Sequence, residues 1–128
     1  MTDTRQALEA LLAGCVEAQC RDGAVATRWR RPLVGVAAAD DPLFVRLREV
    51  VRPSHALPAQ LLPGAHSVVA FFLPFEPRIV SSNRHGGMAS ADWARAYVET
   101  NALIDALCAR AVALLEARGE QARATPAT

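Results

Sequence analysis

The stretch 76–89, EPRIVSSNRHGGMA, gathers the side chains of this sequence that are best suited to holding a ligand. Its composition predicts a long polar loop, and loops of this length in compact domains are often functional. An arginine and a histidine could hold an anion, and a glycine pair lets the backbone approach a ligand. The candidate binding residues here are Asn83, Arg84, His85, Gly86 and Gly87. A solvated surface loop has the same composition, so both interpretations stay open.

A second candidate site is the sequence RWRR at the end of the stretch 24–31, which is itself ambiguous between a short strand and irregular chain. Arg28, Arg30 and Arg31 could contact phosphates while Trp29 stacks on a base, which would make transfer RNA a partner. The alternative is a solvated basic edge anchored by one tryptophan. The net charge of the whole chain is only +1, so a broad basic surface is not expected.

The residues that usually bind metals do not form a recognisable set. The three cysteines are scattered and are expected to be buried free thiols: Cys15, Cys20 and Cys108. The three histidines lack metal-ligand spacing: His55, His66 and His85. An iron–sulfur cluster needs four converging thiolates, so we expect no metal site and no [4Fe–4S] cluster on this chain.

The longest periodic segment, residues 90–118, predicts one amphipathic helix that must lie against an apolar surface. Ser90 is a good N-cap, Asp92 complements the helix dipole, and Gly119 is placed to end the helix. The predicted apolar face consists of Trp93, Tyr97, Ile104, Leu107, Cys108, Ala111 and Leu115. We expect the two aromatic residues of this face to be buried against a strand over residues 67–75.

Asn101 lies in or beside this apolar face, and a buried amide needs a partner at both of its ends. Asn101 is therefore a candidate binding residue, although a local hydrogen bond would explain it as well.

The other predicted elements alternate between helix and strand. They are a helix over 4–20, a strand over 33–39, a helix that starts at Pro42 and ends before Pro53, and a strand over 67–75. A proline-rich connection with a turn at LPGA, residues 62–65, precedes the last strand, whose regular pairing should end near Pro74. The expected fold class is α/β (α+β), with about three strands flanked by three helices.

Length and composition describe one globular domain over residues 1–128. The chain is 52% hydrophobic and 21% charged, which is unlike a disordered protein. Its apolar runs are shorter than a membrane span, and its N-terminus lacks the basic region of a secretory signal. We therefore expect a cytoplasmic protein that does not contact membranes.

Two ordered motifs connect the sequence to a known family. The stretch LLPGAHSVVAFFLPF followed by ASADWARAYVETN resembles the N-terminal region of epoxyqueuosine reductase-like iron–sulfur proteins, which are related to the reductive dehalogenases. The resemblance covers about residues 33–128. It implies part of a nitroreductase-like scaffold that binds cobalamin, next to a ferredoxin-like domain with two [4Fe–4S] clusters. The implied activity is reductive removal of an epoxide oxygen from the transfer RNA base queuosine. Tyr97 and Asn101, from the second motif, join the candidate cofactor-binding residues.

The chain departs from this family in two ways. It has no C-x-x-C-x-x-C motif, and the family's catalytic acid would lie after Thr128, so no catalytic residue is transferred. We expect an incomplete N-terminal part, a split gene or a degenerate member, with residues 120–128 as a frayed tail or truncated strand. Its partner would be a separate C-terminal iron–sulfur portion, or a second copy in a homodimer that covers an open sheet edge. The alternative is a non-catalytic α/β module that binds a ligand or a protein.

Overall fold

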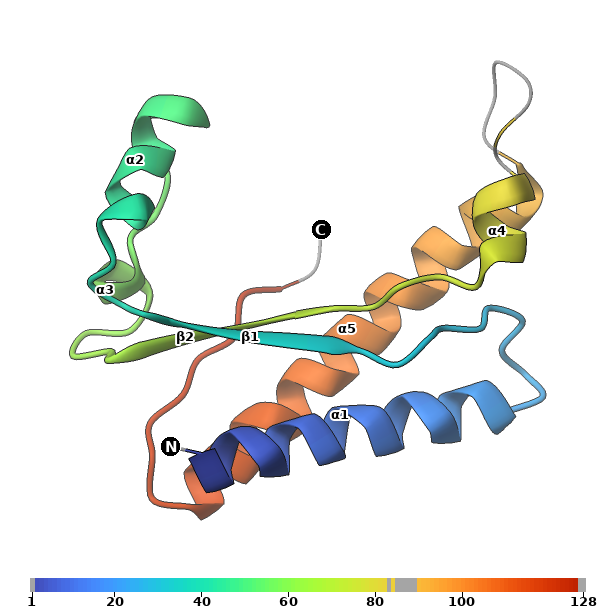
Figure 1. The fold of residues 1–128 in the computed structure, drawn as a ribbon, viewed down its shortest axis with the longest axis horizontal. Coiled ribbons are helices and arrows are strands. Elements are labelled where there is room, and N and C mark those ends of the chain that lie inside the picture. The colour runs from blue at the N-terminus through green and yellow to red at the C-terminus, as the bar shows by residue number, and fades with distance from the viewer. Residues whose placement is uncertain (1, 83, 85–89, 127–128) are drawn as a thin grey trace. The chain divides into compact units, whose positions relative to one another are not determined.

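The computed structural model describes residues 2–82, 84 and 90–126, and in them the chain is mixed helix and sheet, as predicted (Figure 1). The elements are α1 Thr2–Arg21, β1 Leu33–Ala38, α2 Pro42–Val50, α3 Pro58–Leu61, β2 Ser67–Phe72, α4 Pro77–Ser82 and α5 Ala91–Ala117. The chain divides into two compact units. The first joins the residues up to 33 with those from 72 onward, and the second is residues 34–71.

The longest helix, α5, begins and ends where the sequence predicts. The Ser90 hydroxyl accepts a hydrogen bond from the Trp93 amide at 3.0 Å, which satisfies one unpaired donor of the first turn. Gly119 has a φ of 86°, a conformation that favours glycine, and its amide bonds the Glu116 carbonyl at 3.0 Å. Across the described residues, no helix combines the length and apolar character that a membrane span needs.

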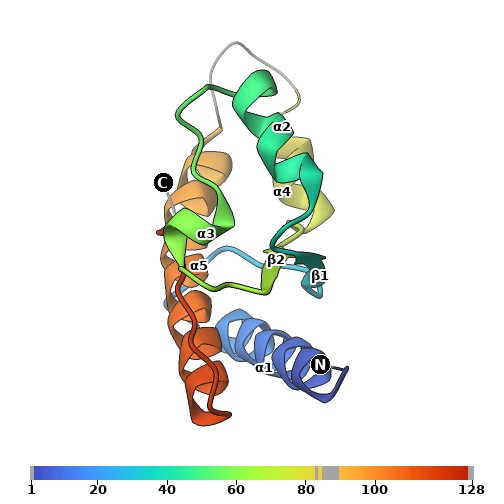
Figure 2. The same cartoon turned by 90° about the vertical axis from the view of Figure 1, so that its left-hand side faces the viewer.

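Helices α1 and α5 lie side by side and build most of the core of the first unit (Figures 1 and 2). Leu8, Leu12 and Val16, spaced four residues apart on α1, are each at most 3% exposed. The buried residues of α5 are Ala96, Thr100, Leu103 and Leu107. At 100° per residue, this buried stripe is rotated by about 70° from the predicted apolar face.

The rotation of the buried stripe bears on the predicted burial of two aromatic residues, Tyr97 and Trp93. Tyr97 was expected to be buried but is 56% exposed, because the side of α5 that packs is the one with the small residues Ala96 and Thr100. Trp93 is half-buried and meets Phe75, just after β2, edge to face at a ring distance of 5.5 Å. Trp93 therefore contacts the predicted strand region but is only half-buried, and Tyr97 is not buried.

The stretch 76–89, predicted as a loop, begins with a helix instead. Helix α4 starts at Pro77, whose fixed φ suits a first helical position, and its Ile79 is 2% exposed beside α5. The Ser82 hydroxyl lies 2.9 Å from the Ser90 hydroxyl, so the end of α4 is tied to the start of α5. The polar composition of the stretch did not predict this helix, in which Ile79 is buried.

The second unit contains the sheet, in which β1 and β2 are antiparallel neighbours. The Ala39 amide extends their pairing to the His66 carbonyl at 2.9 Å. Regular pairing in β2 ends at Phe72, close to Pro74, as predicted. The turn over residues 62–65 is also confirmed, with Gly64 at a φ of 80° and the Ala65 amide bonded to the Leu62 carbonyl at 3.1 Å.

Helix α2 starts as predicted but does not bury its apolar side. Asp41 caps it by accepting a hydrogen bond from the Leu43 amide at 2.9 Å, and Pro42 is its first residue. Arg48 ties it to the following connection, bonding the His55 carbonyl at 3.0 Å and the Gln60 side chain at 2.8 Å. No residue of α2 is buried. Four large apolar residues at this end of the unit are more than half exposed: Leu43, Val45, Val50 and Val51.

The α1–α5 interface should dominate the stability of the first unit. Leu107 is 1% exposed, so Leu107→Ala should lower the free energy of unfolding by about 2–5 kcal/mol through lost burial and a cavity. Val98 is on the same helix but 66% exposed, and Val98→Ala should change stability by less than about 0.5 kcal/mol. Urea denaturation followed by circular dichroism measures both. Equal losses in the two variants would contradict this packing.

Candidate functional site

Trp29 is attached to α5 by a buried hydrogen bond. Its indole Nε1 donates to the Thr100 hydroxyl at 3.0 Å, and the two residues are 6% and 9% exposed. Buried polar groups need partners, and this bond satisfies an indole N–H and a hydroxyl at once. A buried indole has no free face for a base, so base stacking by Trp29 does not fit this structure. Contact between the neighbouring arginines and transfer RNA stays a prediction.

Glu99, the residue before Thr100, holds the same segment of chain, which is residues 24–31. Its carboxylate accepts hydrogen bonds from the Ala26 amide at 3.2 Å, from the Thr27 amide at 2.9 Å and from the Thr27 hydroxyl. Partial burial raises the pKa of Glu99, but these bonds and the nearby charge of Arg95 bring it to a net value below the ordinary 4.5. Glu99 is therefore ionised at neutral pH and serves as a three-fold acceptor.

We call this set of residues the clasp: Ala26, Thr27 and Trp29 on the segment, and Glu99 and Thr100 on α5. The clasp joins parts of the chain more than 70 residues apart in sequence. It also assigns structural roles to the middle of the motif YVETN, since the glutamate and the threonine both turn towards the segment. Sequence reasoning missed Glu99 and Thr27. The only signal was Thr100, a polar residue in or beside the predicted apolar stripe.

Backbone pairing explains which side chains of the basic segment face outward. Trp29 and Phe75 form an antiparallel bridge, and the Arg30 amide bonds the Pro74 carbonyl at 2.8 Å. Side chains alternate along extended chain, so Thr27 and Trp29 turn towards α5 while Arg28 and Arg30 turn away. The predicted ambiguity over 24–31 therefore resolves to irregular chain with one bridge.

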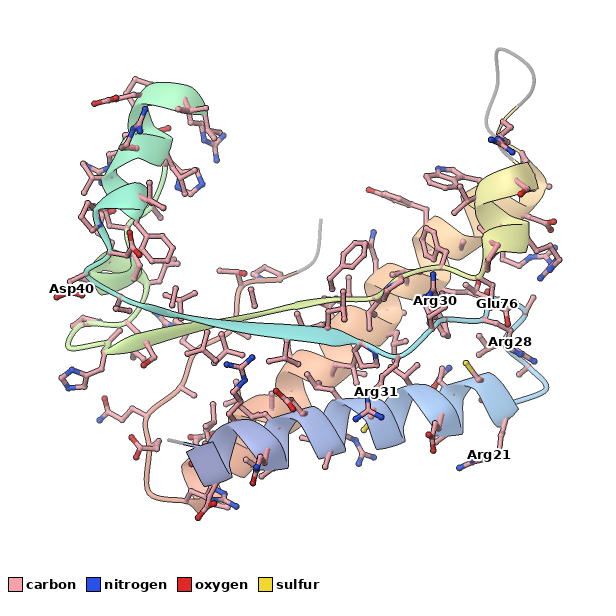
Figure 3. The ribbon with its side chains drawn as sticks, viewed as in Figure 1. Arg21, Arg28, Arg30, Arg31, Asp40 and Glu76 are labelled. Atoms are coloured by element: carbon pink, nitrogen blue, oxygen red, sulfur yellow. The ribbon has the colours of Figure 1, made fainter. Side chains whose placement is uncertain are left out.

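The arginines of the segment form an open basic edge. Arg28 bonds the carbonyls of Val25 and, at 3.0 Å, Thr27, which fixes its guanidinium against the backbone. Arg30 and Arg31 are exposed. Figure 3 shows these three and Arg21 apart from one another rather than aimed at one point. This arrangement matches a basic edge anchored by a tryptophan better than a pocket for a single phosphate.

Tyr97 and Asn101, the other two polar members of YVETN, share a different face of α5. They are four residues apart, so they lie one turn apart on the same side of the helix. Tyr97 is 56% exposed and Asn101 is half-buried. Arg84, before the start of α5, is exposed. The other candidate binding residues lie outside the described part of the chain: Asn83, His85, Gly86 and Gly87.

The cysteine thiols in the described part of the chain do not suit the binding of an iron–sulfur cluster. The three cysteines are half-buried free thiols, and Cys20 directs its sulfur at the Trp29 carbonyl at 3.7 Å. Burial, helped by the Asp105 charge, raises the pKa of the Cys108 thiol, so Cys108 stays protonated at neutral pH. Within the described ranges, no three His, Cys, Asp or Glu side chains are grouped to hold a metal ion.

No protein-family model, curated protein or solved structure matches this chain.

The hydrogen bond from Trp29 to Thr100 can be tested by two substitutions of nearly equal size. Thr100→Val removes the acceptor and leaves a buried indole N–H without a partner, which should lower the free energy of unfolding by about 1–3 kcal/mol. Thr100→Ser keeps the hydroxyl and should preserve the bond, so that it retains most of the stability. Chemical denaturation of both variants, repeated in a Trp29→Phe background, isolates the bond. An equal loss from Thr100→Val in both backgrounds would show that the hydroxyl and indole are not coupled.

Proposed function

We propose that this chain is a non-catalytic part of an epoxyqueuosine reductase-like oxidoreductase that acts in the cytoplasm, and that it provides scaffold and binding surface. The observation that carries the proposal is that the polar residues within 97–101 lie on two different sides of α5. The clasp occupies Glu99 and Thr100, and Tyr97 and Asn101 are left on an accessible face of α5. A motif with an inner structural half and an outer polar half suits a helix that is held rigidly beside a ligand.

The proposed ligand is cobalamin, whose flat corrin ring carries amide groups around its edge. The phenol ring of Tyr97 would contact the ring system, and the side-chain amide of Asn101 would pair with a peripheral amide. Asn83, Arg84, His85, Gly86 and Gly87 precede α5 in the chain and remain the other proposed cofactor-binding residues. When bound, cobalamin would supply the redox chemistry, and the residues of this chain would hold and orient it.

The proposed partner is a separate portion that carries the iron–sulfur clusters and the catalytic acid. The described cysteines are unsuited to cluster binding, so the clusters are assigned to that portion. In this proposal the partner also adds a third strand to the sheet, which would extend the fold towards the nitroreductase-like scaffold. A homodimer that covers the same edge is the competing arrangement.

A non-catalytic module that binds a protein is the second candidate function. It is favoured by the apolar residues that α2 and its end leave exposed, among them Val50 at 73% and Leu43 at 64%. Scattered apolar surface residues are normal, but adjacent ones on a helix without a buried residue often mark an interaction site. This function needs no cofactor, and that difference separates the two candidates.

Cobalamin binding can be measured by anaerobic titration of the purified chain followed by absorption spectroscopy. The reductase proposal predicts a saturable spectral change. Tyr97→Ala and Asn101→Ala should each weaken binding by about tenfold, equivalent to about 1.4 kcal/mol for one lost contact. Val98→Ala is the matched control, since Val98 is 66% exposed on the same turn and should bind like the parent chain. No saturable change, or equal weakening in all three variants, would overturn the cobalamin proposal and favour the protein-binding module.

Cluster assembly offers an independent test of the proposed division between this chain and its partner. Anaerobic reconstitution with iron and sulfide should leave almost no iron bound after desalting, because the scattered thiols cannot supply four converging thiolates. Retention of about four irons per chain would place a cluster on this chain and contradict the assignment to a partner.

A further inference from the structure

The clasp contains one ionisable group, and that group carries most of its hydrogen bonds. Glu99 accepts three bonds from two consecutive residues, and one of its oxygens receives both donors of Thr27. The segment after Gly23 has no helix or strand of its own until β1, so these bonds are a large share of what orders it. Its other attachments include the Trp29–Thr100 bond, the Cys20 thiol bonded to the Trp29 carbonyl, and the backbone pairing next to Phe75.

We propose that Glu99 is an acid-sensitive latch: its ionised carboxylate holds Ala26 and Thr27 against α5, and its protonation frees them. Protonation changes one carboxylate oxygen of Glu99 from a hydrogen-bond acceptor to a donor. An ionised carboxylate only accepts hydrogen bonds, whereas a protonated one must donate through one oxygen. Because the amides and the hydroxyl of the segment all act as donors towards Glu99, an added proton competes directly with one of them.

Three charged residues lie on or next to the parts of the chain that the latch joins: Arg95, Arg28 and Asp22. Arg95, one turn earlier on α5, favours the ionised state. Arg28, on the segment, is turned back onto the Val25 and Thr27 carbonyls. Asp22, after the end of α1, accepts a hydrogen bond from the Ala24 amide at 2.9 Å. The pKa of Glu99 is lowered in the folded state, so the latch is fully closed above about pH 4.5 and opens as the pH falls through the folded value.

Opening the latch would release the part of the segment that precedes the basic edge. Arg28 is fixed by carbonyls of Val25 and Thr27, so it would lose its fixed position together with them. Trp29 has its own bond to Thr100 and would stay attached. The structure thus separates an acid-sensitive half of the clasp, at Ala26 and Thr27, from an acid-insensitive half at Trp29.

Amide hydrogen exchange of the full chain between pH 6 and pH 3, corrected for the intrinsic rates, tests the latch residue by residue. Protection of the Ala26 and Thr27 amides should fall as the pH drops below about 4.5 and should level off below the folded pKa, where Glu99 is protonated in the folded state as well. The Leu107 amide, in the α1–α5 core, should keep its protection and so report that the unit remains folded. Loss of protection at Leu107 in parallel would show global acid unfolding and overturn the proposal.

Two variants and one control complete the experiment. Glu99→Gln removes the titrating group, so the Ala26 and Thr27 amides should exchange with no pH dependence beyond the intrinsic one. Thr27→Val removes one of the three bonds and should move the opening to higher pH. Glu9→Gln is the control, since Glu9 is an ion-paired glutamate on α1, 2.9 Å from Arg5, and should leave the transition unchanged. An unchanged transition in Glu99→Gln would show that Glu99 is not the latch.

Discussion

The hydrogen bond between the Trp29 indole and the Thr100 hydroxyl is the constraint that ties residues 24–31 to α5, beside the α1–α5 core of the first unit. A large aromatic side chain is buried on α5, and its one polar group must find a partner there. Ala96, a turn before Thr100, is fully buried at 0% exposure and is small enough to let other groups approach closely. Once this side of α5 faces the segment and α1, the side with Tyr97 is left accessible. The buried stripe of α5 includes Thr100, which accepts this bond, together with Ala96, Leu103 and Leu107.

The sequence predicted α1, β1, α2, β2 and α5, whose ends are determined largely by local chemistry, but not the short helices α3 and α4. The N-cap at Ser90, the stop at Gly119, the cap at Asp41 and the turn around Gly64 all depend on side chains within a few residues. The burial of Trp29 could not be predicted in this way, since its partner is 71 residues away. The helix α4 was missed for a related reason, because contact with α5 decides it.

The ligand-binding role of the candidate site residues stays a prediction, and the structure shows only where the described ones lie. Tyr97 and Asn101 lie on one accessible face of α5, as a ligand-binding role requires, although Tyr97 was expected to be buried. Trp29 of the basic segment is buried against α5 and cannot stack on a base, whereas Arg30 and Arg31 are exposed. Glu99 was not considered as a site residue at all. A glutamate on a helix is usually a solvated surface residue, and only the distant Ala26 and Thr27 donors reveal its role.

The clasp gives structural roles to two residues of the motif YVETN. Glu99 and Thr100 hold the segment, and this fixes the rotation of α5 about its axis. The same rotation sets the direction in which Tyr97 and Asn101 present their side chains. In this account, the proposed cobalamin face is therefore a consequence of the clasp.

Hydrogen exchange of the Trp29 indole N–H is the most direct test of this account. It can be followed at neutral pH by two-dimensional NMR, because the chain has two tryptophans and Trp93, half-buried at the start of α5, provides an internal comparison. We predict that the Trp29 indole proton exchanges only on unfolding of the first unit, with a protection similar to that of the Leu107 amide, and that Trp93 exchanges much faster. Exchange of the Trp29 indole at the rate of a free indole would show that the bond to Thr100 does not hold this fold together.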